Sequence, residues 1–352
     1  MKNPKVIYSL VKYIVGAASV ILILFVLDTY LSGFWHLLFL LFGINIILAI
    51  SLNITNAWIG FFSIGHGGIM LAAAYVTAFL TLPPSFKNGI INLHLPSFIL
   101  NTQFPFLPAL LIGALFGTII GVILVLPALR LRSFYFVTGT LGFNIIMMTI
   151  AENIPKITNG PMGLRQFPDY TNIWWVWGVA ILLIYLGLKL KKSYIGRAFI
   201  VIGKDPDLAA HMGINLLKYK TYAFALSSFF TSIGGILWVH LILNLFPKAF
   251  GLGFVFNVVA MIVIGGMGSI SGAVMGAAII TCFTEVLAPV EEGFSVLGLS
   301  FPPFLGLTTV LLGIFLIVIL ITRPQGIMGE KEIKLDFLKR FLKERIKLGR
   351  TG

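Results

Sequence analysis

Charged residues are scarce in this sequence. Asp, Glu, Lys and Arg make up 11% of the 352 residues, whereas hydrophobic residues make up 58%. So much apolar surface exceeds what one globular core can bury, which excludes a soluble globular protein and indicates a polytopic membrane protein. The sequence also has a single cysteine, Cys282, so disulfides and thiolate metal clusters within one chain are excluded.

Ionisable groups are nearly absent from the apolar runs, which contain only Glu285 of the 12 acids. Proton-driven or sodium-driven transporters and intramembrane enzymes normally need such groups inside the bilayer, where they are costly to keep. The chain also lacks paired carboxylates and the HExxH, GxSxG and P-loop motifs. We therefore predict no catalysis, cofactor or metal, and any uphill transport must draw its energy from another polypeptide.

Long apolar stretches are abundant, and a helix needs about 20 such residues to cross the hydrocarbon of a bilayer. We predict an all-α fold of about ten transmembrane or partly spanning helices. Their expected ranges are 14–31, 34–54, 57–82, 105–129, 134–152, 173–188, 219–243, 254–270, 271–289 and 303–322. The first stretch follows three lysines, as in a signal peptide, but no small-residue cleavage site follows it, so we interpret it as a span.

Positive charge is distributed unevenly over the connecting segments. With the N-terminus in the cytoplasm, 21 of the 25 Lys and Arg residues lie on the cytoplasmic side, and four lie outside: Lys87, Lys156, Arg165 and Lys248. This asymmetry predicts that both termini are cytoplasmic. The net charge of +13 is therefore a topology signal, with attraction to membrane lipids as a secondary effect, and we expect no nucleic-acid partner.

Residues 189–220 form the longest polar stretch before the tail and are the best candidate for a cytoplasmic docking surface. We predict that Asp205 caps a short helix there, with Pro206 in its first turn and Gly213 ending it in the left-handed conformation. Ala209 and Ala210 would give it a small face onto which a partner can pack. The alternative is an ordinary surface helix.

Two further segments have a predicted role. The outer loop at residues 83–104 is rich in Pro and Asn and nearly uncharged, and we expect an ordered external cap. The tail at 330–352 places Ile333, Phe337 and Phe341 along one side of a basic helix, which predicts a helix lying on the inner membrane surface. The alternative is a solvated charged tail.

Glycine clusters interrupt two apolar stretches, at 57–80 and 254–287, and small residues follow each cluster. Matching interruptions suggest a weak internal repeat, and transporters build translocation sites from them because unwound backbone is tolerated only where it faces protein or water. We expect the translocation path to be lined near Ser63, Gly65, His66, Gly67, Gly68, Gly265, Gly266, Gly268, Ser269 and Ser271.

Other glycines recur at intervals of four residues, which predicts close packing of neighbouring helices. They form two ladders, Gly113, Gly117 and Gly121, and Gly268, Gly272 and Gly276. His66 has two interpretations: a neutral histidine that hydrogen-bonds backbone freed by the glycines, or a side chain in direct contact with substrate. No buried carboxylate is available to pair with it, which argues against a proton relay.

Six segments carry a resemblance to one known family. They are NAWIGFFSIGHGGIMLAAAY (56–75), LRLRSFYFVTGTLGFNII (129–146), TNGPMGL (158–164), GRAFIVIGKDPDLAAHMGINLLKYKTYAF (196–224), VIGGMGSISGAVMGAAII (263–280) and RPQGIMG (323–329). In this order they resemble the LivM-type permease subunits of branched-chain amino acid ABC importers. Asp207-Leu208-Ala209-x-x-x-Gly213 is similar to the Glu-Ala-Ala-x-x-x-Gly loop with which such permeases dock on their ATPases, with Asp in place of Glu and Leu208 in place of Ala.

The resemblance implies a permease domain over residues 1–329, in the inner membrane of a bacterium or archaeon. It implies import of branched-chain amino acids by alternating access, with a LivH-type permease, two cytoplasmic ATP-binding subunits and an extracytoplasmic binding protein as partners. ATP hydrolysis would belong to those ATPases. Implied docking residues are Asp205, Asp207, Leu208, Ala209, Ala210 and Gly213.

Two alternatives remain open at this point. Permeases of the same architecture carry urea, short amides or other small solutes, and nothing in the expected lining separates these from branched-chain amino acids. A stand-alone channel or facilitator also needs no buried charges.

Overall fold

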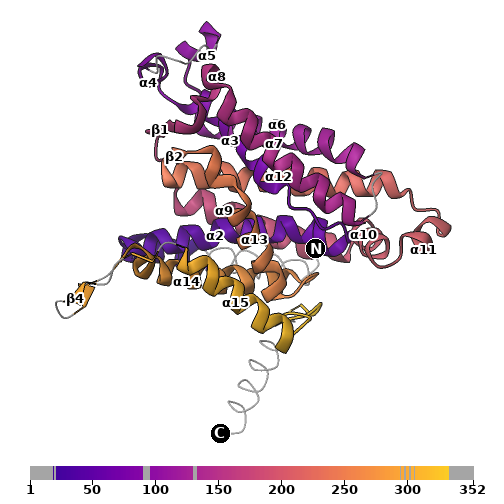
Figure 1. The fold of residues 1–352 in the computed structure, drawn as a ribbon. Helices are drawn as coiled ribbons and strands as arrows, with labels where there is room; N and C mark the ends of the chain where they lie inside the picture. The colour runs from indigo at the N-terminus through magenta and orange to yellow at the C-terminus, as the bar shows by residue number, and fades with distance from the viewer. Residues whose placement is uncertain are drawn as a thin grey trace, which may run out of the picture.

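The computed structural model describes residues 19, 21–89, 96–129, 133–293, 295–296, 299–300, 303–304 and 306–332. These residues are mostly helical (Figure 1). The longer helices are Ile21–Tyr30, α2 (Phe34–Asn53), α3 (His66–Thr81), α6 (Phe106–Ala128), α7 (Ser133–Asn153), α9 (Ile173–Lys192), α10 (Tyr194–Lys204), α12 (Leu216–Ile242), α13 (Leu252–Gly265), α14 (Ile270–Glu292) and α15 (Leu307–Thr322). Shorter pieces are η1 (Ile54–Trp58), α4 (Pro84–Gly89), α5 (Ser97–Asn101), α8 (Pro155–Thr158), η2 (Gly160–Met162), α11 (Pro206–His211) and η3 (Pro247–Phe250).

Two pairs of very short antiparallel strands complete the described fold. β1 (Leu164–Arg165) pairs with β2 (Asn244–Leu245), so that Leu164 lies opposite Leu245. β3 (Ser295–Val296) pairs with β4 (Leu299–Ser300). Neither pair is long enough to form a layer, so the core lies mainly between helices, with Leu164 and Leu245 of the first pair buried in it.

Seven of the described helices are long and apolar enough to cross a membrane, and three shorter apolar helices, Ile21–Tyr30, α3 and α15, accompany them. The prediction of an all-α polytopic protein with about ten spanning or partly spanning helices is therefore confirmed over the described residues. Polytopic proteins of this kind can span a bilayer because every backbone group in a helix finds its partner within the same segment.

The expected crossing or partial crossing at 57–82 is interrupted at its glycine cluster. The range 57–82 begins in η1, a π-helical turn that continues α2, and residues 59–65 are not helical. α3 starts only at His66, after Gly65. The glycines and the serine of this stretch lower the helix propensity, so the backbone unwinds where neighbouring helices can contact it.

The helices form two neighbouring groups (Figure 1). α3, α6, α7 and α12 lie together on one side, and α2, α9, α13, α14 and α15 lie on the other. α2 and α12 contact each other and join the groups. We call the end of the molecule that carries α4 and α5 the α4 end, and the end that carries α10 and α11 the α11 end.

The first glycine ladder is a packing surface, as predicted. α6 lies against α3 and α12 along it, so closely that an added Cβ would overlap a facing side chain at each of the three glycines. The facing side chains are Thr77 at Gly113, Ser232 at Gly117 and Ser228 at Gly121.

The second ladder is only partly a packing surface. Gly272 and Gly276 let α14 lie directly on the backbone of α13. Gly268 differs, because its Cβ would meet nothing closer than Glu330 at 3.9 Å and its φ is +89°. This glycine serves the turn between the two helices, a backbone conformation that side chains disfavour.

At the α4 end, Lys87 holds the predicted cap together. Its side chain is fully buried, and its ammonium donates hydrogen bonds to the carbonyl oxygens of Phe79, Ile99 and Thr102 at 3.1, 2.5 and 2.6 Å. All three protons of the ammonium thereby have an acceptor. The loop is therefore ordered in its described residues; residues 90–95, and the predicted tail helix from Ile333 onward, lie outside the described part of the chain.

Candidate functional site

The first interruption is the extended segment 59–65 between η1 and α3. Asn56 bonds to Ser63 on both sides: its Oδ1 accepts from the Ser63 N–H at 2.9 Å, and its Nδ2 donates to the Ser63 carbonyl at 3.4 Å. Gly60 has φ of +73° and lies against the backbone of Gly203 in α10. Backbone groups of Ser63, which no helix satisfies here, thus find their hydrogen-bond partners in a neighbouring side chain.

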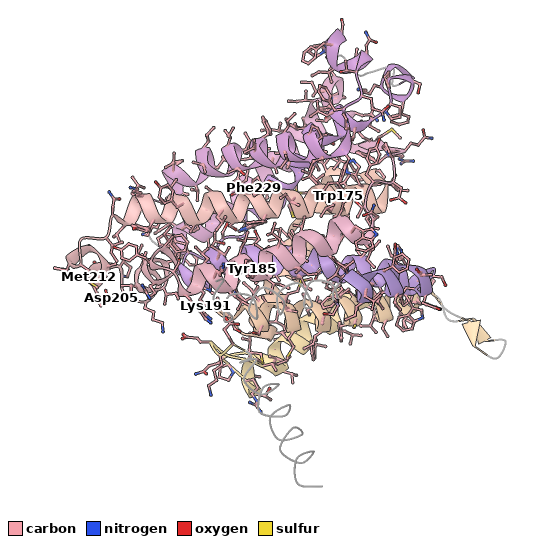
Figure 2. The ribbon with its side chains drawn as sticks, turned by 180° about the vertical axis from the view of Figure 1, so that it is seen from behind. Trp175, Tyr185, Lys191, Asp205, Met212 and Phe229 are labelled. Atoms are coloured by element: carbon pink, nitrogen blue, oxygen red, sulfur yellow. The ribbon has the colours of Figure 1, made fainter. Side chains whose placement is uncertain are left out.

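The second interruption is the turn at residues 266–269 between α13 and α14. Gly266, with φ of +121°, ends α13, and the Ser269 hydroxyl accepts from the Gly272 N–H at 3.0 Å to cap α14. Lys191 of α9 donates to the Gly268 carbonyl at 2.6 Å. This helical hairpin therefore lies at the α11 end, beside the lysine that Figure 2 shows there.

Asn53, the last residue of α2, connects the two interruptions. Its Nδ2 donates to the Ser269 carbonyl at 2.9 Å, and its Oδ1 accepts from the Gly268 N–H at 2.9 Å. Trp58 adds a bond from its indole N–H to the Gly268 carbonyl at 3.2 Å. The structure thus brings together two glycine-rich segments that lie about two hundred residues apart in the sequence.

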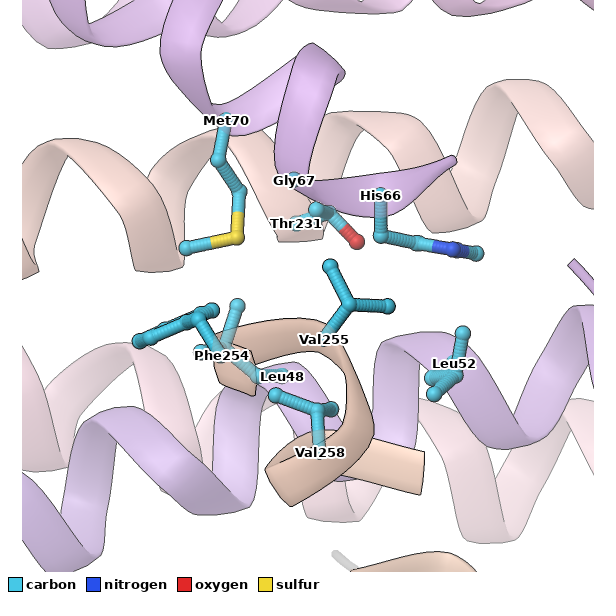
Figure 3. Close-up of a pocket in the computed structure, with 9 residues that line it drawn as sticks. All are labelled: Leu48, Leu52, His66, Gly67, Met70, Thr231, Phe254, Val255 and Val258. Atoms are coloured by element: carbon cyan, nitrogen blue, oxygen red, sulfur yellow. The ribbon is translucent and has the colours of Figure 1, made fainter. Parts of the chain in front are cut away.

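The residues predicted to line the path do not share one cavity within the chain. Ser63 and Gly65 border a small cavity of about 30 Å³ that also touches α6, α7 and α12. His66 and Gly67 border another of about 10 Å³, closed by apolar side chains of α2 and α13 (Figure 3). Both spaces are too small for an amino acid.

A much larger groove, of about 1090 Å³, lies on the side of the molecule formed by α13, α15 and residues 322–331. α13 contributes Phe256, Val259 and Val263 at helical spacing, and each interruption contributes one apolar side chain, Phe62 and Met267. Phe256 remains 49% exposed and Leu320 of α15 42% exposed, so the groove is open along its length. None of these apolar residues was among the predicted site residues, because α13 is apolar on every side and its sequence has no period that marks the groove.

His66 does not hydrogen-bond freed backbone in this structure. Its side chain is buried, and its Nε2 lies 3.0 Å from the hydroxyl of Ser227 in α12, which in turn donates to the Ser51 carbonyl of α2 at 2.7 Å. The partner of the imidazole is thus a side-chain hydroxyl, not freed backbone, and no open surface reaches it. Its contacts join α3 to α12 and, through Ser227, to α2.

The predicted docking helix is present as α11. The Asp205 carboxylate accepts from the Leu208 N–H at 2.9 Å, and Gly213 follows the helix with φ of +76°. Figure 2 shows Asp205 and Met212 at the end of the molecule, beyond the long helices. Cap and stop residues thereby hold α11 as a separate turn.

Of the two alanines predicted to face a partner, Ala210 is exposed and Ala209 is not. Ala209 is fully buried in the hydrophobic core cluster of its own chain, so it offers no surface to a partner. Leu208 and Met212 are instead 52% and 65% exposed. A helix this short must bury one side for its own stability, which leaves the larger apolar residues outside.

The comparison with known proteins agrees with this geometry. The model of the family "branched-chain amino acid transport system / permease component" matches residues 36–320. The chain belongs to this family of transport permeases. It is therefore a multi-pass membrane permease component of the ABC transporter type.

Among its relatives is the high-affinity branched-chain amino acid transport permease LivM of Escherichia coli, 26% identical over 83% of this chain and 70% of the relative. The probable LivM of Methanocaldococcus jannaschii is 22% identical over 88% of this chain and 97% of the relative. A ribose import permease, RbsC of Haemophilus influenzae, is 26% identical over 69% of this chain and 76% of the relative. No solved structure matches the chain.

Proposed function

We propose that this permease is one half of an importer that carries branched-chain amino acids into the cytoplasm. Family membership supports transport, and the names of the LivM relatives support this class of substrate. A ribose permease is also among the relatives, so similarity of this kind supports the fold more strongly than it supports one substrate, because one architecture can carry several solutes. The apolar stripe of Phe256, Val259 and Val263 suits a substrate with an aliphatic side chain.

The groove supports a path completed by a second permease of LivH type. A carrier must expose its path to each side in turn, and a path between two subunits can open by relative movement of the subunits. The groove is open within the single chain and has an apolar wall, which a second subunit would close. In this proposal an extracytoplasmic binding protein delivers substrate at the α4 end, the α11 end is cytoplasmic, and both termini lie in the cytoplasm of the bacterial or archaeal cell.

The observation that carries the proposal is α11. It is separately capped, it projects at one end, and it exposes Leu208 and Met212. An exposed apolar pair on a rigid turn fits a groove on a partner, here one of two cytoplasmic ATP-binding subunits that would supply the energy. Asp205, Asp207, Ala210 and Gly213 would then shape the docking loop, with Ala209 anchoring it to its own chain.

A matched pair of substitutions tests this docking. Leu208 and Leu107 are exposed to 52% and 48%, and they lie on α11 and in the first turn of α6. Leu208→Ser is expected to reduce capture of the co-expressed ATPase at least tenfold, because apolar anchors dominate such interfaces, whereas Leu107→Ser, outside the 189–220 docking surface, leaves capture intact. Equal capture by the two variants, or uptake that survives deletion of residues 205–213, would contradict the docking role.

Reconstitution separates this function from a stand-alone channel. Liposomes with this chain alone should show no flux of leucine, isoleucine or valine, and flux should need the second permease, both ATPases and ATP. A ligand screen on the cognate binding protein decides between branched-chain amino acids and urea, short amides or sugars. Leucine flux through the isolated chain would refute the importer.

A further inference from the structure

The carboxylate of Glu332 is bound at the N-terminus of α14. It accepts from the N–H groups of Ile270 and Ser271, both at 2.9 Å, and from the Ser271 hydroxyl at 2.7 Å. The Ser269 hydroxyl lies 3.2 Å away and the Lys191 ammonium 2.6 Å away. One carboxylate thus satisfies backbone groups that the first turn of a helix leaves free, on the positive end of its dipole.

These contacts favour the ionised form of Glu332. Partial burial by itself raises the pKa of this carboxyl, but the hydrogen bonds from Lys191, Ser271 and Ile270 outweigh burial and lower the pKa to about 2. The group is therefore ionised throughout the range of cytoplasmic pH. An ionised acceptor makes stronger hydrogen bonds than a neutral one, so the attachment keeps its strength over this range of pH.

A second attachment lies a few residues earlier. The N–H groups of Ile327 and Met328 donate to the carbonyls of Ile264 and Gly265 at 2.9 and 3.0 Å, at the end of α13. Gly326, with φ of +73°, lies against Gly266, where a Cβ would overlap backbone. Residues 323–332, which we call the strap, are therefore bonded to both arms of the α13–α14 hairpin.

The strap also faces the docking side of the molecule. Lys191, in addition to its bonds to Glu332 and Gly268, donates to the Glu330 carbonyl at 3.4 Å. Lys204, the residue before the α11 cap, lies 3.2 Å from the Glu330 carboxylate. That second pair is well exposed and weak on its own. A cavity of about 290 Å³ lies between α10, the turn at 266–269 and Glu330 of the strap.

We propose that the strap couples the α10–α11 docking unit to the α13–α14 hairpin, with Glu332 as the residue that positions the hairpin. The strap forms one wall of the large groove, so a displacement of the strap changes the groove directly. Movement of α11 reaches the strap through Lys204 at the end of α10 and through Lys191 at the adjoining end of α9. From the strap it reaches α14 through Glu332. The anchor itself rests on geometry alone, while its coupling role rests on the proposed function.

Hydrogen–deuterium exchange on the full chain, assembled with its co-encoded partners in lipid nanodiscs, tests the anchor. Glu332→Ala is expected to speed exchange of the Ile270 and Ser271 amides about tenfold or more, since bonds to charged groups are the stronger ones. Glu330→Ala is the matched control: it removes an exposed carboxylate two residues away and should leave these amides unchanged. Unchanged exchange in Glu332→Ala overturns the proposal.

A charge swap separates a helix anchor from a simple ion pair. If Glu332 acts only through Lys191, the double variant Lys191→Glu with Glu332→Lys restores slow exchange and uptake. If the N–H groups of α14 need an anion, as proposed, the swap rescues neither, because an ammonium cannot accept their hydrogen bonds. Rescue by the swap therefore contradicts the proposal.

Uptake and ATP hydrolysis, measured in the same nanodisc or liposome preparation, test the coupling role. Glu332→Ala is expected to keep ATP hydrolysis within about twofold and to lose most of the uptake per ATP. Faster exchange with undiminished uptake overturns the coupling role. A wild-type complex without ATP-dependent uptake refutes the proposed function and the coupling role with it, and the exchange measurement still decides on the anchor.

Discussion

Replacing Asn53 with leucine removes the connection between the two interruptions while keeping the number and branching of the side-chain heavy atoms. Asn53 is fully buried at the end of α2 and makes two bonds, to the Gly268 N–H and to the Ser269 carbonyl, each at 2.9 Å. Leucine can make neither bond. We expect the α13–α14 turn to lose its fixed position against α2, and the protein to lose stability.

The size of this loss in free energy of unfolding depends on which hydrogen bonds the two partners of Asn53 keep. The Ser269 carbonyl also accepts from the Ala273 N–H of α14, so its lost bond costs about 0.5–1.5 kcal/mol. The Gly268 N–H would be left without a protein acceptor, which costs about 1–3 kcal/mol. The sum is roughly 1.5–4.5 kcal/mol of the free energy of unfolding.

The matched control is Asn45→Leu, on the same helix. Asn45 makes one bond, to the Thr281 hydroxyl at 2.7 Å, and that hydroxyl keeps its own bond to the Ala277 carbonyl. Such a bond between membrane helices is worth about 0.6 kcal/mol. The free energies of unfolding of both variants can be measured in mixed detergent and SDS micelles by circular dichroism. A difference below about 0.5 kcal/mol between them would refute the reasoning, since it would mean that the turn does not depend on Asn53.

Three further predictions concern packing, the cap and pH. Gly117→Val places side-chain atoms on Ser232 and should lower the free energy of unfolding by about 1–3 kcal/mol. Gly178→Ala is the control: a Cβ there meets nothing within 4 Å, so this variant should raise the free energy of unfolding by about 0.5 kcal/mol. An equal loss in both variants would contradict a packing role for the glycine ladder. Lys87→Met leaves three carbonyls without their donor and should speed proteolysis of the loop at residues 83–104 several-fold without changing the spans. The pKa of Glu332 is lowered to about 2, so the contribution of this carboxylate to stability is complete above its ordinary pKa near 4.5 and is lost as pH falls from there toward 2. Exchange of the Ile270 and Ser271 amides, corrected for the intrinsic rate, should therefore not change between pH 5 and 8. A change in that range would contradict the role of Glu332 as an anchor.

Several features were predictable because they depend on short stretches of sequence. The spans follow from the length of apolar runs, and α11 follows from Asp205, Pro206 and Gly213, whose conformational preferences act locally. The break before His66 follows from the glycines that precede it. Orientation, partners, the tail helix and the internal repeat remain predictions, and the two interruptions differ in form, one an extended segment and the other a tight turn.

Other features were beyond sequence reasoning because membrane helices are apolar on every side. In a soluble protein, polar and apolar faces show which residues are inside, but lipid removes that contrast, so the groove and the buried side of each helix leave little pattern. Ala209 was expected to face a partner and faces its own core instead. His66 was expected to bond freed backbone or substrate, and its Nε2 lies beside the hydroxyl of Ser227 on another helix.

The sequence by itself determined that this chain is a helical membrane protein with glycine-broken spans and a capped helix outside them, because apolar length, glycine and capping residues act within a few residues of one another. Only the tertiary structure decided that Asn53 bonds the turn at 268–269 and that Glu332 holds the start of α14. Those bonds join segments between about 60 and 216 residues apart. Which buried polar group finds which partner depends on how the helices pack, and helices that are apolar all round carry no periodic signal of that packing.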